Sequence, residues 1–123
     1  DPGLIALYER SGREQHGRAL ETAVFLELER RGYEVSYVRT DEGWEVDFLA
    51  HRAGEAPLLI QVCLESGDDA TWAREVRALE AAKAVHRTSR AFLVTFDATP
   101  PSKRLPRGLT WTSAAQWLLE ERT

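Results

Sequence analysis

The sequence predicts a single α/β domain in which helices cover both faces of a mixed β-sheet. A length of 123 residues suits one domain. Apolar residues recur with helical spacing in some stretches and with strand spacing in others. The predicted order is helix, three strands, helix, strand, and then a further strand and helix. The first three strands should form a meander, and the helix after them predicts a parallel neighbour for the fourth strand.

The first half of the chain is expected to form one helix and the meander. A helix is predicted over residues 17–32, because Leu20, Val24 and Leu28 recur every four residues and Gly32 is a stop signal. Tyrosine, valine and alternating apolar residues then indicate strands. These strands are predicted over residues 33–40, 44–51 and 58–65, with turns at 41–43 and 52–57.

The second half is expected to return to the sheet through a crossover helix. That helix is predicted over residues 71–87, and a short buried strand over 91–96. The loop 97–108 holds three of the five prolines and separates this strand from the last two elements. A final strand is predicted over residues 109–112, followed by a helix over 113–121 that Ser113 can cap.

Composition sets the context of this domain. Residues 1–16 are interpreted as a lead-in segment and residues 17–123 as the domain. The chain has no methionine and begins "DPG", so we expect a segment of a longer protein. Its one cysteine excludes an internal disulfide and favours a reducing, cytoplasmic location. No apolar run approaches the ~20 residues of a membrane span, so no membrane partner is expected. The oligomeric state is left open.

Charge is distributed unevenly along the chain. The net charge is −4 and the pI about 5.4, which disfavours a protein that coats DNA through lysines and arginines. Residues 83–107, however, contain six basic residues and one acid, a local net charge of +5. A basic edge of this kind could bind DNA. The alternative is a solvated surface with cations near a helix C-terminus, where the helix dipole favours them.

Polar side chains interrupt two of the predicted strands. Alternation places Asp47 on the face of its strand opposite Val46 and Phe48. On the next strand it places Gln61 and Cys63 together on one face. If the two strands pair, the aspartate, the glutamine and the cysteine can meet.

Two helices also carry charges on their apolar sides. Glu21 falls within the buried arc of the first helix and must be neutralised, paired or ligating there. The alternative is pairing with a nearby arginine. Lys83 projects between Trp72 and Val76 on the second helix. The alternative interpretation is that Lys83 buries the aliphatic part of its side chain and keeps its ammonium group in water.

These elements and residues resemble the PD-(D/E)XK nuclease-like superfamily, whose common core is helix, three strands, helix, strand. The blocks "GRALETAVFLELERRGYEV", "YVRTDEGWEVDFLA", "LLIQVCLE" and "TWAREVRAL" more closely resemble the uncharacterised nuclease-like domain at the C-terminus of prokaryotic AAA-type ATPases. The resemblance covers roughly residues 3–97. It implies a restriction-endonuclease-like fold and an N-terminal ATPase portion as partner. No GxxxxGK[ST] motif occurs in this chain, so nucleotide binding is not expected of it.

The resemblance also assigns positions in the nuclease motif. Glu21 matches the helix glutamate and Asp47 the metal-binding aspartate, so these two would hold Mg²⁺ in an active nuclease. Gln61 stands where the second acid belongs, and Cys63 stands where the lysine belongs. A cysteine cannot offer the cation that stabilises developing charge. Lys83 is the candidate for a relocated lysine.

Three functional hypotheses follow. The first is a catalytically degenerate nuclease fold that serves as a nucleic-acid-binding or regulatory module, in which case this segment is not an enzyme. The second is an active Mg²⁺-dependent deoxyribonuclease with Lys83 as the relocated cation. The third is a structural or oligomerisation domain without nucleic-acid contact. The residues at 61 and 63 favour the first hypothesis.

Overall fold

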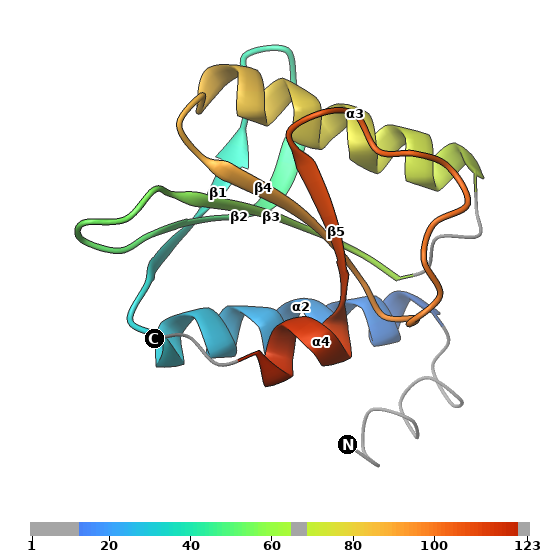
Figure 1. Cartoon of the computed structure of the whole chain (residues 1–123), viewed down its shortest axis with the longest axis horizontal. Coiled ribbons are helices and arrows are strands. Elements are labelled where there is room, and N and C mark those ends of the chain that lie inside the picture. Colours follow the sequence, from blue (N-terminus) through green and yellow to red (C-terminus); the bar gives the residue numbers. More distant parts are fainter. Residues whose placement is uncertain (1–12, 65–68, 121–123) are drawn as a thin grey trace.

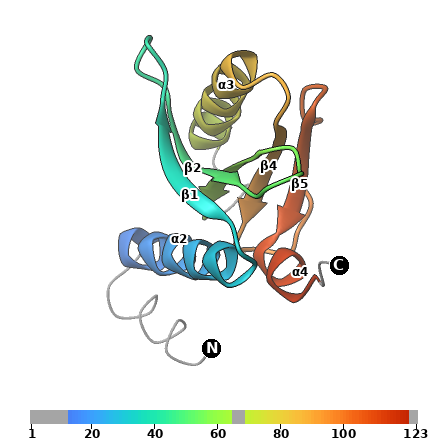
Figure 2. The same cartoon turned by 90° about the vertical axis from the view of Figure 1, so that its left-hand side faces the viewer.

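The computed structural model describes residues 13–64 and 69–120, which form one five-stranded sheet between two layers of helices (Figure 1). Helices α2 and α4 lie against one face of the sheet and α3 against the other (Figures 1 and 2). None of the helices in these two stretches is both long and apolar enough to span a membrane. In chain order the elements are α2 (Arg13–Arg30), β1 (Glu34–Arg39), β2 (Glu45–His51), β3 (Leu58–Cys63), α3 (Asp69–Val85), β4 (Arg90–Thr95), β5 (Leu109–Ser113) and α4 (Ala114–Leu119).

The strand order is β1-β2-β3-β4-β5. The pairs β1–β2 and β2–β3 are antiparallel, which confirms the predicted meander. The pairs β3–β4 and β4–β5 are parallel, because α3 carries the chain back across the sheet between β3 and β4. The α/β fold class and the helices on both faces were therefore predicted correctly from the sequence.

Two hydrophobic cores lie on the two faces of the sheet. Strand β3 is buried on both faces and supplies alternate residues to each core. Ile60 belongs to the core under α2 and α4, which contains Val24 and Trp117. Cys63 belongs to the core under α3, together with Leu79. The predicted alternation along this strand is confirmed.

Strand β2 does not alternate in the predicted way. Ser36 pairs with Leu49 and Val38 with Val46, so β2 has one more residue than β1 in this interval. The extra residue forms a β-bulge, which reverses the alternation of side chains between the two faces of the sheet. Val46 lies in the core under α3, whereas Phe48 lies in the core under α2. The prediction that these two side chains share one face was wrong.

Helix α2 begins earlier than predicted, at Arg13. Residues 13–16 were assigned to the lead-in but are helical, and Gly17 does not interrupt the helix. The rest of the proposed lead-in, residues 1–12, lies outside the described residues, as does Glu65 at the predicted end of the third strand. At the other end of α2, Gly32 adopts φ +89°, and its N–H donates to the carbonyl of Glu29.

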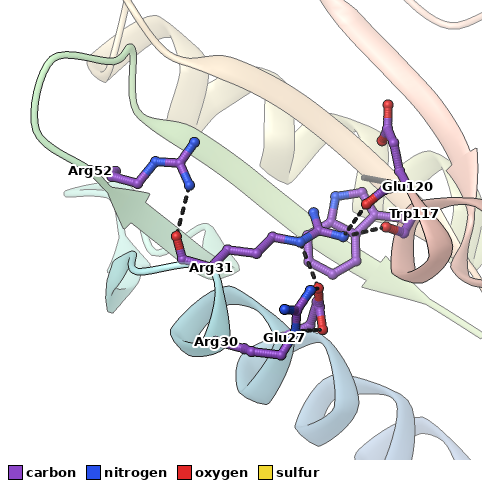
Figure 3. Close-up of polar contacts among 6 residues, drawn as sticks. All are labelled: Glu27, Arg30, Arg31, Arg52, Trp117 and Glu120. Atoms are coloured by element: carbon purple, nitrogen blue, oxygen red, sulfur yellow. Dashed lines mark hydrogen bonds and ion pairs between the residues drawn. The ribbon is translucent and has the colours of Figure 1, made fainter. Parts of the chain in front are cut away.

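A cluster around Arg31 joins the end of α2 to α4 (Figure 3). The Arg31 guanidinium donates to the Glu27 carboxylate at 2.7 Å and to the carbonyl of Trp117 at 2.8 Å. It also lies 4.4 Å from the centroid of the Trp117 ring. Arg52, in the β2–β3 turn, donates to the Arg31 carbonyl at 2.7 Å. These contacts hold three separate elements together beneath the sheet.

Candidate active site

The candidate site lies where β2 and β3 diverge. Regular pairing of these strands ends at Phe48 and Ile60. Beyond that point, side-chain oxygens rather than backbone carbonyls accept the hydrogen bonds from backbone N–H groups. The N–H of Asp47 donates to Oε1 of Gln61 at 2.9 Å, and the N–H of Val62 donates to Oδ2 of Asp47 at 2.8 Å. The strands therefore separate without leaving these two N–H groups unpaired.

Gln61 extends this network to α3. Its side chain is buried, with 6% of the residue exposed, and Nε2 donates to a carboxylate oxygen of Glu75. The amide thus accepts from β2 with its oxygen and donates to α3 with its nitrogen. A carboxylate at position 61 could accept from Asp47 but could not donate to Glu75 unless it were protonated.

These polar groups line a hollow of about 370 Å³ between the β1–β2 hairpin and α3. Arg74 is the positively charged residue in its wall, and its Nε lies 3.8 Å from Oε1 of Glu75. The lining residues are Gly43, Trp44, Glu45, Asp47, Gln61, Arg74, Glu75 and Ala78.

The acids at this site are held in an unfavourable environment for negative charge. Burial, together with the nearby Glu21 and Glu75, raises the pKa of Asp47 to about 7, although the Val62 N–H acts in the opposite direction. Burial also raises the pKa of Glu75, where Arg74 opposes the shift and Glu21 adds to it. Burial raises the pKa of Glu21 as well, against the lowering effect of Arg18. Acidic side chains therefore outnumber basic ones among the residues that line this hollow.

The structure brings together three of the residues selected from the sequence. Asp47 and Gln61 are hydrogen bonded, and Glu21 is close enough to Asp47 to influence its pKa. Glu21 itself lines a neighbouring hollow between α2 and β1. Cys63 follows Gln61 on the same face, but it is only 3% exposed, packs in the core under α3 and does not line the Asp47 hollow.

Lys83 is not brought to this site. Its Nζ donates to the carbonyl of Ser89 at 2.6 Å, beyond the C-terminal end of α3. Glu75 lies two helical turns earlier, so Lys83 is about 12 Å further along the helix axis. The arrangement gives no support to Lys83 as a relocated catalytic cation.

Glu75 is the site residue that the sequence reasoning underrated. One of its carboxylate oxygens lies 3.8 Å from Nε of Arg74, and the other accepts from Gln61. A signal was present in the sequence. Glu75 is three residues after Trp72 and four before Leu79, both buried, so it lies on the sheet-facing side of α3.

The arrangement does not form a ready metal site. Mg²⁺ prefers several oxygen ligands in octahedral geometry. Among the residues that the structure describes, no three histidine, cysteine, aspartate or glutamate side chains are placed to hold one ion. One oxygen of Asp47 and one of Glu75 are already acceptors in the network. As they are placed, these residues do not fit the metal that the nuclease motif implies.

The fold and the site define a restriction-endonuclease-like domain, with a strand aspartate and a neighbouring strand glutamine beside two helices. Residues 13–105 match the Mrr_cat family, described as restriction endonuclease, and the chain belongs to that family within the PD-(D/E)XK superfamily. Family membership confirms the fold class and the nuclease-like character predicted from the sequence.

The chain is also similar to the uncharacterized protein MJ1544 of Methanocaldococcus jannaschii. The two are 46% identical over 70 residues, a match that covers 54% of this chain and 15% of the relative. The chain therefore corresponds to a small part of that protein. No solved structure matches this chain.

Proposed function

We propose that this chain is a nuclease-fold module that binds nucleic acid without cleaving it and serves the ATPase portion of a longer AAA-type protein. Membership in a restriction endonuclease family supports nucleic acid as the ligand. The geometry of the motif residues supports the loss of cleavage.

The observation that carries this proposal is the hydrogen-bond network that links Asp47, Gln61 and Glu75. Each member accepts from or donates to another member or the backbone of β3. Position 63, which would supply the cation in the nuclease motif, holds a buried cysteine. Loss of one preorganised charge-stabilising donor typically lowers the rate by about 10²–10³.

The test is a cleavage and binding assay on the purified full-length protein. Single-stranded, duplex and branched DNA are incubated with Mg²⁺ or Mn²⁺, and binding is followed without metal. We expect binding that weakens as salt increases, because phosphate contacts release counterions, and no metal-dependent cleavage. Cleavage that disappears in Asp47→Ala would contradict the proposal. Absence of salt-dependent binding would favour a structural or oligomerisation domain instead.

An active deoxyribonuclease is the second candidate, and one observation favours it. Arg74 lines the Asp47 hollow and could supply the cation that Lys83 does not. In that case Arg74→Gln would abolish cleavage and Lys83→Gln would leave it unchanged. The same pair of variants distinguishes this candidate from the relocated-lysine hypothesis.

The ATPase context rests on the sequence blocks that resemble the C-terminal domain of AAA-type ATPases. The match to a small part of a much longer relative is compatible with a further domain. A GxxxxGK[ST] motif upstream in the same gene product, with ATP hydrolysis by the full-length protein, is the expected result. A full-length sequence without such a motif would remove this part of the proposal.

A further inference from the structure

A second hollow, of about 290 Å³, lies between the C-terminal end of α3 and the start of β5. Three basic residues line it, together with one acid and two small or aliphatic side chains. The lining residues are Lys83, Arg87, Arg107, Glu80, Ala84 and Leu109. We name it the basic hollow.

The basic hollow and the Asp47 site lie at opposite ends of the sheet. In the parallel strands, Leu58 pairs with Arg90 and Ala91 with Leu109, so the first residues of β3, β4 and β5 lie side by side. The basic hollow is at this end. The Asp47 carboxylate instead contacts Val62, near the last residue of β3. The basic hollow is therefore a surface separate from the nuclease motif.

Lys83 organises the basic hollow. Its Nζ donates to the carbonyls of Ser89 and Arg87 at 2.6 and 3.4 Å, in the turn that follows the C-terminal end of α3. Its stem lies across Gly108, where φ is +94° and an added Cβ would be 3.2 Å from Cε of Lys83. Lys83 thus packs against the loop before β5, and Arg87 and Arg107 line the same hollow as Lys83.

Arg87 and Arg107 have no carboxylate partner among residues 13–64 and 69–120, and both are exposed. Several other arginines do have carboxylate partners. Arg30 and Arg31 pair with Glu27, and Arg52 pairs with Glu55. In the basic hollow Glu80 is the one acidic residue against three cations. The guanidinium groups there remain available for an external anion.

We propose that Arg87 and Arg107 bind phosphates of a nucleic-acid backbone. This inference rests on the proposed function and identifies the surface through which the chain would bind nucleic acid. A guanidinium presents a planar fork of donors that matches phosphate oxygens. The hollow offers charge rather than an apolar anchor, which favours a phosphodiester chain over a protein partner. Lys83 is a positioning residue in this scheme, because its ammonium is already bonded to the chain.

The experiment compares two double variants with equal loss of positive charge. The first is Arg87→Gln with Arg107→Gln. The matched control is Arg30→Gln with Arg39→Gln, two exposed arginines located at the end of α2 and on β1. Anisotropy of a labelled DNA duplex is measured with the full-length protein over a series of KCl concentrations. Circular dichroism verifies that each variant is folded.

We expect the first variant to bind about tenfold more weakly, and its slope of log K against log salt to fall in magnitude by about 2, one for each lost phosphate contact. The control should retain the wild-type slope. Unchanged binding by the first variant would overturn the inference, and so would an equal loss in both variants. In either case salt-dependent binding without cleavage would leave the proposed function intact.

Two further outcomes separate the inference from the proposed function. If the wild type cleaves DNA, the non-cleaving function fails, while the two slopes still decide the role of Arg87 and Arg107. Poly-L-glutamate serves as the probe for an acidic protein partner. If the first variant loses binding to poly-L-glutamate but keeps its affinity for DNA, the basic hollow is a protein-binding surface and the inference is wrong.

Discussion

Two groups of charged side chains in this chain have opposite electrostatic character. At the end of α2, hydrogen bonds from Arg30 and Arg31 lower the pKa of Glu27 to about 2. At the point where β2 and β3 separate, which we call the fork, burial and neighbouring acids raise the pKa of Asp47 to about 7. The first group contributes to stability at neutral pH, whereas the second reduces it. A chain that keeps buried acids at a cost to stability usually does so for function, and this contrast separates the structural cluster from the candidate site.

The largest effect should come from the structural cluster, through Arg31→Ala. The Arg31 side chain is 4% exposed, and the substitution removes its pairing with Glu27 and its contact with the Trp117 ring. We expect the free energy of unfolding to fall by about 3 kcal/mol, the range found when one partner of a buried ion pair is lost. Urea unfolding followed by tryptophan fluorescence measures this change.

Arg30→Ala is the matched control for that measurement. Arg30 pairs with the same carboxylate, but its side chain is 70% exposed. Its loss should lower the free energy of unfolding much less than the loss of Arg31 does, because water screens an exposed pair. Equal losses in the two variants would show that charge alone, rather than the buried position of Arg31, stabilises the cluster.

A smaller effect of opposite sign is expected at the fork, from Asp47→Asn. The pKa of Asp47 rises from 3.8 to about 7 on folding, so the folded state binds its proton more tightly. The resulting stability is complete below about pH 4 and is lost as the pH rises through 7. An asparagine keeps an acceptor for the Val62 N–H and does not ionise. At pH 8 we expect the variant to be more stable than the wild type by about 2 kcal/mol, after allowance for water at a half-buried group.

Thermal or urea unfolding at pH 4 and pH 8 tests this expectation, and the advantage of Asp47→Asn should disappear at pH 4. Asp41→Asn, in the exposed β1–β2 turn, is the matched control for the removal of one carboxylate. An Asp47→Asn variant that is less stable at both pH values would mean that the carboxylate is compensated in the folded chain, for example by a bound cation.

The elements of the fold differ in how well the sequence predicts them. Helix and strand periodicity identified the fold class, and β3 was interpreted correctly because its alternation is regular. Strand β2 was not, since one extra residue reverses the faces of Val46 and Phe48 and no local signal marks it. The sequence singled out Asp47 as a motif residue, but its role as a hydrogen-bond acceptor for Val62 depends on the separation of two strands.

The positions of Lys83 and Glu75 on α3 show a second limit of prediction from sequence. Helical periodicity placed Lys83 on the apolar side of its helix, yet its ammonium is at the far end of α3. Glu75, on the same helix, reaches the fork. Periodicity defines the face of a helix but not which turn of the helix meets the site, because that depends on how α3 is placed along the sheet. The roles of these two residues therefore required the structure.

The smallest effect should appear at acid pH, through Glu27→Gln. The pKa of Glu27 falls from 4.5 to about 2 on folding, so its contribution to stability is present above 4.5 and is lost as the pH falls through 2. Relative to the glutamine variant, the wild type should lose about 1 kcal/mol over this window, a value reduced for solvent screening at the exposed Arg30. Urea unfolding at several pH values measures the difference. Because Asp47 loses stability in the opposite direction, these two groups together predict a stability maximum between about pH 4 and 5. Parallel curves for wild type and Glu27→Gln would mean that Arg31 stabilises the chain through Trp117 alone.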